Sequence, residues 1–159
     1  MLFRSNAVDL AAMTAGKPFV LVTCSLTCNV ARNQQKRVDE LRTRLGDRAK
    51  VVMLYTIEAH PSGAICPYTG SEWVPQDNVD DQVLVGQPAT MLERLALAHR
   101  YATEIAKGTP VLVDTLGDPS WRALGEAPNL GLAVGSDQVV LARTGWCDVV
   151  ALEQALHGR

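Results

Sequence analysis

The chain has 159 residues, a length typical of one domain with a buried core, and we expect residues 1–159 to form a single domain. The net charge of −2 and the pI near 5.9 lack the basic excess of proteins that bind nucleic acid or acidic membranes. No apolar run reaches the roughly 18 residues of a membrane-spanning helix. The N-terminal residues also lack the apolar core of a secretory signal, so we expect a cytoplasmic protein.

The first half of the chain predicts two strands separated by a long helix. A continuous apolar run at 17–23 is typical of a strand buried on both faces. Apolar residues recur on one face over 29–45, which predicts a helix, and Gly46 is expected to end it. A second buried strand is expected at 51–55, and a long irregular segment rich in Pro, Gly and Ser follows at 57–87.

The second half continues the alternation. The periodicity predicts a helix over 88–106 with a proline in its first turn, and a short strand at 111–113. Two further strands, 130–134 and 139–143, are expected to form a hairpin, and Asp148 is a good N-cap for a last helix. Alternating strands and helices imply right-handed crossovers and parallel strands, and the hairpin adds antiparallel ones. The order predicts the α/β class with a thioredoxin-like fold, a central mixed β-sheet flanked by helices on both faces.

Two of the four cysteines, Cys24 and Cys28, lie where the first strand passes into the first long helix. Backbone N–H groups and the helix dipole stabilise a thiolate at such a position, which favours a reactive thiol. The alternative is a pair of buried structural cysteines. The two thiols can form a disulfide if the loop brings their Cα atoms within about 7 Å, which a turn before a helix permits.

The expected topology gathers other reactive side chains at the same edge of the sheet. Glu58, His60 and Cys66 follow the second strand, and the carboxyl ends of parallel strands share one edge. The last strand is expected to run parallel to the first, which brings Cys147 to this edge. Pro128 lies there too, because it precedes a strand that runs the opposite way.

Two segments resemble the iodothyronine deiodinase-like branch of the thioredoxin/peroxiredoxin superfamily. Ser25-Leu-Thr-Cys-Asn-Val-Ala-Arg32 is similar to the nucleophile motif of that family, and Tyr55-Thr-Ile-Glu-Ala-His-Pro-Ser62 is similar to its acidic-Ala-His-Pro segment. Glu93-Arg94, the segment 110–115 and the closing hairpin extend the resemblance over nearly the whole chain from Lys17.

Three departures from the family bear on the substrate. Cys28 stands where animal deiodinases carry selenocysteine, as in bacterial relatives, and Leu26 replaces a family cysteine. After Pro61 the chain reads Ser-Gly-Ala-Ile-Cys where the family has Ser-Asp-Gly-Trp. A sulfur nucleophile and a changed loop argue against deiodination of thyroid hormone. The resemblance instead implies thiol oxidoreduction, with a peroxide as one possible substrate.

The cysteines have distinct expected roles. Cys28 is the expected nucleophile, with a pKa lowered by the helix N-terminus. Cys24 is the nearest candidate for the resolving thiol, with Cys66 and Cys147 as alternatives. Cys66 is also a candidate for substrate contact, because mobile loops can deliver a partner.

Four other side chains are expected to assist the nucleophile. His60 would act as general acid or base, or is a surface histidine. Glu58 would orient it or carry a proton, or is a solvated residue at the end of a strand. The positive charge of Arg32 would favour a thiolate, or it is an ordinary exposed arginine. Thr27 would donate a hydrogen bond to sulfur, or it caps the helix.

Two more residues are candidates for contact with the substrate. Pro128 would be the cis-proline that thioredoxin-like folds place opposite the nucleophile, or it only starts a strand. Trp73 would line a pocket, or it only anchors its loop.

These expectations define a thiol-dependent oxidoreductase of peroxidase- or deiodinase-like chemistry. The Cys28 thiolate attacks an electrophile such as a peroxide, a second thiol forms a disulfide, and an external thiol reductant restores the pair. That reductant would be a thioredoxin-like protein or a low-molecular-weight thiol. No cofactor, bound metal, nucleic acid or membrane partner is expected. One alternative is a copper-binding module built on Cys24 and Cys28 with His60, and another is a non-catalytic redox sensor.

Overall fold

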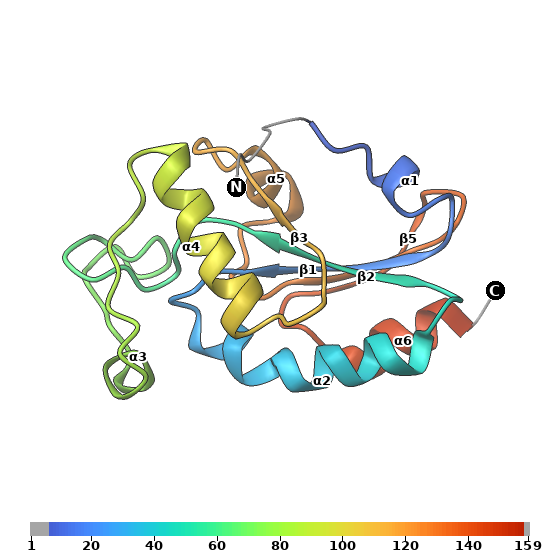
Figure 1. Ribbon diagram of the computed structural model, residues 1–159, viewed down its shortest axis with the longest axis horizontal. Helices are drawn as coiled ribbons and strands as arrows, with labels where there is room; N and C mark the ends of the chain where they lie inside the picture. The colour runs from blue at the N-terminus through green and yellow to red at the C-terminus, as the bar shows by residue number, and fades with distance from the viewer. Residues whose placement is uncertain (1–6, 158–159) are drawn as a thin grey trace.

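The computed structural model describes residues 7–157, in which five strands form one mixed sheet in the order β3-β2-β1-β4-β5 (Figure 1). β1 pairs parallel with β2 and antiparallel with β4, while β3 and β5 form the two edges. The strands are β1 Phe19–Cys24, β2 Lys50–Tyr55, β3 Val111–Val113, β4 Gly131–Val134 and β5 Val140–Thr144. The mixed sheet and the parallel direction of β1 and β5 confirm the prediction.

Helices cover both faces of this sheet, as expected. α2, α4 and α6 pack against one face, and α1 and α5 cover the other (Figure 1). α3 lies away from the sheet, in the long segment that projects beyond the ends of β1 and β2. The helices are α1 Leu10–Met13, α2 Asn29–Leu45, α3 Gln76–Asp80, α4 Met91–Glu104, α5 Pro119–Leu124 and α6 Val149–His157.

The continuous apolar run of β1 is explained by burial on both sides. Val20 and Val22 point to the face covered by α2, and Phe19 and Leu21 point to the opposite face, where α1 packs. The parallel register with β2 sets Cys24 beside Tyr55. The chain leaving β1 therefore meets the chain leaving β2 at one edge of the sheet.

The boundaries of the middle elements differ from the prediction. α4 begins at Met91 and not at Pro88, because Thr90 and Glu93 form a capping box that starts the helix there. The segment 57–87, expected to be irregular throughout, contains the short helix α3.

The closing elements follow the prediction closely. The turn after β4 is closed by a hydrogen bond from Gly135 N–H to the Val139 carbonyl. The Asp148 side chain accepts from the N–H groups of Val150 and Ala151, each at 3.1 Å, which caps α6. Among the described residues 7–157, no helix has the length and apolar character that crossing a membrane requires.

Candidate active site

The loop between β1 and α2 lies against the chain that follows β2. The Leu26 N–H donates to the Tyr55 hydroxyl at 3.1 Å, and the Ala59 N–H donates to Ser25 Oγ at 3.2 Å. Both contacts are buried, where a hydrogen bond is costly to leave unmade. They join the two segments that carry the sequence resemblance.

Glu58 is a fully buried carboxyl group at the centre of this junction. Its Oε2 accepts from the N–H and the hydroxyl of Thr27, at 2.8 and 2.6 Å, and its Oε1 accepts from the Tyr55 hydroxyl. Thr27 Oγ1 in turn accepts from the His60 N–H at 3.0 Å. Burial raises the pKa of Glu58, although its hydrogen bonds from Thr27 and Tyr55 act to lower that pKa.

This geometry corrects the roles expected for Thr27 and Glu58. The single proton of the Thr27 hydroxyl goes to Glu58, so it does not serve a sulfur atom, and the N-cap of α2 is Cys28. Glu58 is neither solvated nor bonded to the His60 ring. It reaches His60 through the Thr27 hydroxyl, which holds the His60 backbone in place.

Cys28 is the N-cap residue of α2, and its Sγ accepts from the Ala31 N–H at 3.4 Å. The residue is 1% exposed, and this burial raises the pKa of its thiol to about 11. The N–H groups of Ala31 and Val30 and the charge of Arg32 lower that pKa, as predicted, but their effect is smaller. The expected net lowering of the Cys28 pKa is therefore wrong for this state of the protein.

Arg32 fastens the loop to the segment around α3. Its guanidinium donates to the Leu26 carbonyl at 2.7 Å, to Asn78 Oδ1 at 3.0 Å and to Asp81 Oδ2 at 2.9 Å. Asn78 Nδ2 also donates to the Thr27 carbonyl at 2.9 Å. Arg32 is thus a largely buried structural clamp, besides contributing positive charge near Cys28.

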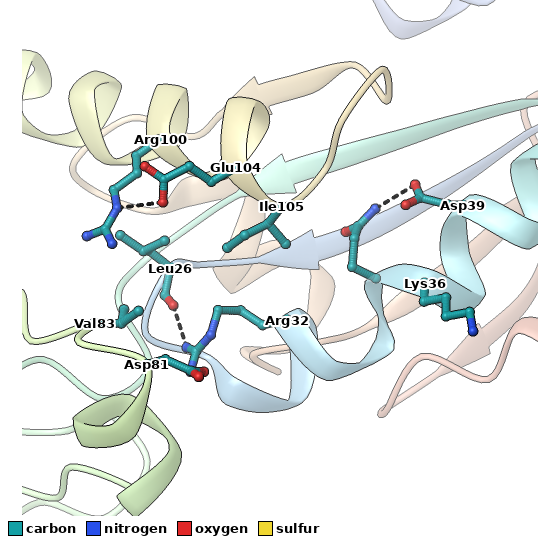
Figure 2. A pocket seen from close by; sticks show the side chains of 10 residues that line it. Leu26, Arg32, Lys36, Asp39, Asp81, Val83, Arg100, Glu104 and Ile105 are labelled. Carbon is teal, nitrogen blue, oxygen red and sulfur yellow. Dashed lines mark hydrogen bonds and ion pairs between the residues drawn. The ribbon is translucent and has the colours of Figure 1, made fainter.

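A cavity of about 500 Å³ lies beside Arg32, between α2 and α4 (Figure 2). Arg32 reaches across it from α2 toward the Leu26 carbonyl and Asp81, and Arg100 pairs with Glu104 on α4. Both acidic and basic groups line the wall. The residues that line the cavity are Leu26, Arg32, Gln35, Lys36, Asp39, Asp81, Val83, Arg100, Glu104 and Ile105.

All four cysteines are free thiols and all four are buried. Burial raises the pKa of Cys24 well above its usual value, and the neighbouring Cys28 raises it further. Burial also raises the pKa of Cys147, between β5 and α6, to about 12. The Cys24 thiol lies inside the core on the α2 face of the sheet.

His60 contacts the fourth cysteine. Its Nδ1 lies 3.8 Å from Cys66 Sγ, and both residues are buried, so His60 is not a surface histidine. The ring of Trp73, which is 49% exposed, packs edge-on against the imidazole with the ring centroids 4.4 Å apart. Burial, and then the charge of Arg32, lower the pKa of His60. Substrate contact by Cys66 and Trp73 stays a prediction.

Pro128 lies beside the end of β1 but is not a cis-proline. Every peptide bond in the described part of the chain is trans. The Thr23 hydroxyl donates to the Ala127 carbonyl at 3.1 Å and accepts from the Leu130 N–H at 2.7 Å, which binds the segment around Pro128 to β1. The alternative that Pro128 leads into a strand agrees with the start of β4 at Gly131.

Two further residues of the site were not expected from the sequence. Tyr55 reads as an ordinary residue of a buried strand, yet its hydroxyl binds both Leu26 and Glu58. Arg94 is buried in an ion pair with Asp118 at 2.7 Å, and its charge lowers the pKa of Glu58. Arg94 lies within the resemblance, but the sequence around it does not indicate a buried ion pair with a residue 24 positions away.

The copper-binding alternative gains no support from this arrangement. Within residues 7–157, no group of three or more His, Cys, Asp and Glu side chains is placed to hold a metal ion. His60, which such a site would need, contacts Cys66.

The sequence matches no protein-family profile, and no curated protein is significantly similar to it. Solved structures do share its fold. A thioredoxin-like protein from Aeropyrum pernix has a TM-score of 0.63 at 9% identity, with 94% of this chain and 81% of that chain covered. A putative thiol:disulfide interchange protein DsbE from Chlorobium tepidum has a TM-score of 0.57 at 14% identity, with 95% and 84% covered.

A third similar structure is the exposed lipoprotein thioredoxin Etrx1 from Streptococcus pneumoniae. Its TM-score is 0.54 at 16% identity, with 94% of this chain and 90% of that chain covered. At these levels of identity the likeness concerns the fold. The chain has an α/β thioredoxin-like fold.

Proposed function

We propose that this protein is a thiol-dependent oxidoreductase whose nucleophile is Cys28. The observation that carries the proposal is the position of its Sγ, which caps α2 and accepts the Ala31 N–H, directly after the buried Thr27–Glu58 contact. The helix N–H groups and the charge of Arg32 favour the thiolate form of this sulfur, which is the form that reacts as a nucleophile. The name of the Chlorobium tepidum structure, a thiol:disulfide interchange protein, points to the same class of chemistry.

The proposed reaction begins with loss of the Cys28 proton. The thiolate attacks one oxygen of a peroxide, an S–O bond forms, the O–O bond breaks, and the other oxygen leaves with a proton as water or an alcohol. Cys28 is then a sulfenic acid. A second thiol attacks its sulfur, water leaves, and two electrons from an external thiol reductant later restore both thiols.

Within this class of oxidoreductase, we propose that the site is of the deiodinase-like type. The support is the buried contact between its two motif segments, in which Tyr55, Thr27 and His60 surround Glu58 directly or through one hydrogen bond. A carboxyl group with a raised pKa is suited to holding and passing a proton near the nucleophile. The cytoplasmic location and the identity of the external reductant remain predictions.

A thiol count with a peptide map tests the proposal. After one equivalent of hydrogen peroxide, the wild type should rapidly lose two thiols to a disulfide that contains Cys28. Cys147→Ser is the matched control and should do the same, whereas Cys28→Ser should keep its thiols. Slow, scattered oxidation in all three proteins would overturn the proposal. Oxidation without repeated turnover in the presence of a thiol reductant would indicate a redox sensor instead of an enzyme.

A further inference from the structure

We infer that Cys66 is the thiol that resolves oxidised Cys28, and that the His60 imidazole takes the proton of Cys66 in that step. This inference rests on the proposed function, because it concerns the second half of the same reaction. It departs from the expectation that Cys24, which is nearer in sequence, forms the disulfide.

The first support is the contact between Cys66 and His60. The 3.8 Å between Cys66 Sγ and His60 Nδ1 is a hydrogen-bond distance for sulfur, and burial of both residues keeps water from taking the place of either partner. The Trp73 ring against the imidazole restrains its rotation. Burial, and then the charge of Arg32, disfavour the imidazolium, and in the neutral tautomer that carries its proton on Nε2 the ring can accept the thiol proton at Nδ1.

The second support is the position of this pair beside the nucleophile. The His60 N–H donates to Thr27 Oγ1 at 3.0 Å, and Thr27 is covalently bonded to Cys28. Burial raises the pKa of the Tyr68 hydroxyl, two residues from Cys66, and negative charge on Cys28 or on Cys66 raises it further. Thr27, His60 and Tyr68 thus link the surroundings of Cys66 to those of Cys28.

The third support is a difference in freedom between the two candidate thiols. Cys66 belongs to a compact turn in which its N–H donates to the Ser71 carbonyl and its carbonyl accepts from Gly70. The tip of this turn is exposed, so it can shift without breaking a strand. Cys24 ends the central strand, and its carbonyl accepts from the Thr56 N–H. A shift of the Cys24 backbone toward another sulfur would disturb this pairing with the chain after β2.

The step balances without a further reactant. The proton of Cys66 passes to His60 Nδ1, and the Cys66 thiolate attacks the sulfur of the Cys28 sulfenic acid. The S–S bond forms as the S–O bond breaks, and the departing hydroxide takes the proton from His60 to leave as water. The peroxide of the first step is the oxidant.

The test uses the full chain, one equivalent of hydrogen peroxide, and dimedone as a trap for sulfenic acid. The wild type and Cys24→Ser should give a Cys28–Cys66 disulfide in the peptide map. Cys66→Ser, with Cys66→Ala as a second variant if the first does not fold, should instead accumulate the dimedone adduct of Cys28. His60→Asn should convert the Cys28 sulfenic acid to the disulfide at least about tenfold more slowly than the wild type does.

The outcomes separate the two proposals. If Cys28 is not oxidised in the wild type, the proposed function fails. If Cys28 is oxidised but pairs with Cys24 or Cys147, or if Cys66→Ser still forms a Cys28 disulfide at the wild-type rate, the inference about Cys66 is overturned and the proposed function stands. An unchanged rate of disulfide formation in His60→Asn would remove His60 from the step.

Discussion

Burial, hydrogen bonds and charges act in opposite directions on the pKa of Cys28, and their effects differ in size. Burial disfavours its thiolate, while the N–H groups at the start of α2 and the Arg32 guanidinium favour it, and burial prevails. The charge on Glu58 adds to the effect of burial, because it lies close enough to raise the Cys28 pKa. The thiol is therefore sensitive to the charge on a single neighbouring side chain.

Glu58→Gln should lower the pKa of Cys28. Glutamine keeps the volume of the side chain and an acceptor for Thr27, but it removes the negative charge that opposes the thiolate. The measurement is the rate of Cys28 alkylation by iodoacetamide as a function of pH, read from a peptide map. The midpoint should move to lower pH in Glu58→Gln, and Glu153→Gln on α6 should leave it in place. A midpoint that stays fixed or moves upward in Glu58→Gln would contradict this account.

The position of a single residue in the fold could be predicted where it depends on the neighbouring sequence. The position of Cys28 at a helix start follows from an apolar run that ends just before a helical pattern. The net pKa of its thiol could not be predicted, because desolvation depends on how tightly distant segments cover it. The hydrogen bonds of Thr27 likewise depend on Glu58, which is 31 residues away in the sequence.

At the scale of elements, long periodic segments were predictable and short ones were not. α2 has the predicted bounds because its 17 residues repeat an apolar face. α3 and α5 have only 5 and 6 residues, too few to show a period, and their stability comes from packing. Pro119 at the first turn of α5 was a usable signal for that helix.

The connection between α4 and the turn before α5 depends on one buried ion pair. Arg94 donates to both carboxylate oxygens of Asp118, at 2.7 and 3.2 Å, and to the Thr115 carbonyl at 2.7 Å. Both partners of the pair are nearly inaccessible to solvent. A buried charge that loses its partner is strongly destabilising.

Asp118→Asn should therefore lower the free energy of unfolding by about 3 kcal/mol or more. Asparagine suits the left-handed backbone at this position, where φ is 49°, so the loss reflects the missing charge. Urea unfolding measures the effect. Asp81→Asn is the matched control, since its ion pair with Arg32 is 56% exposed on the Asp81 side and should cost less than about 1 kcal/mol. Equal losses in the two variants would show that burial does not set the strength of these pairs.

For the whole molecule, the buried thiols, including that of the proposed nucleophile Cys28, also set the tolerance of alkaline pH. Burial raises the pKa of Cys28 from 9.0 to about 11 and that of Cys147 from 9.0 to about 12. The unfolded chain releases these protons near pH 9 while the folded chain keeps them. Rising pH between 9 and about 11 for Cys28, and between 9 and about 12 for Cys147, thus favours unfolding, and the stability that the raised pKa values contribute is complete only below pH 9.

Wild-type protein should lose about 2 kcal/mol more stability than Cys28→Ser when the pH rises from 8 to 10.5. The reason is that serine at position 28 has no proton to release in this range. Urea unfolding of both proteins at several pH values measures the difference. Parallel loss of stability in the two proteins would show that Cys28 keeps no raised pKa in the folded state.

The central place of β1 has a consequence for how the molecule opens. β1 is hydrogen-bonded to β2 on one side and β4 on the other, and all six of its residues are buried. Its amide protons should exchange with solvent only through global unfolding, whereas those of the exposed turn after Cys66 should exchange through local fluctuations. Cys28 caps the helix that follows this strand, whereas Cys66 opens the exposed turn, so we expect the two cysteines to belong to cooperative units of different stability. A bond between their sulfurs would tie the less stable turn to the more stable strand and helix. We therefore expect proteolysis at this turn to be slower in the oxidised protein than in the reduced protein.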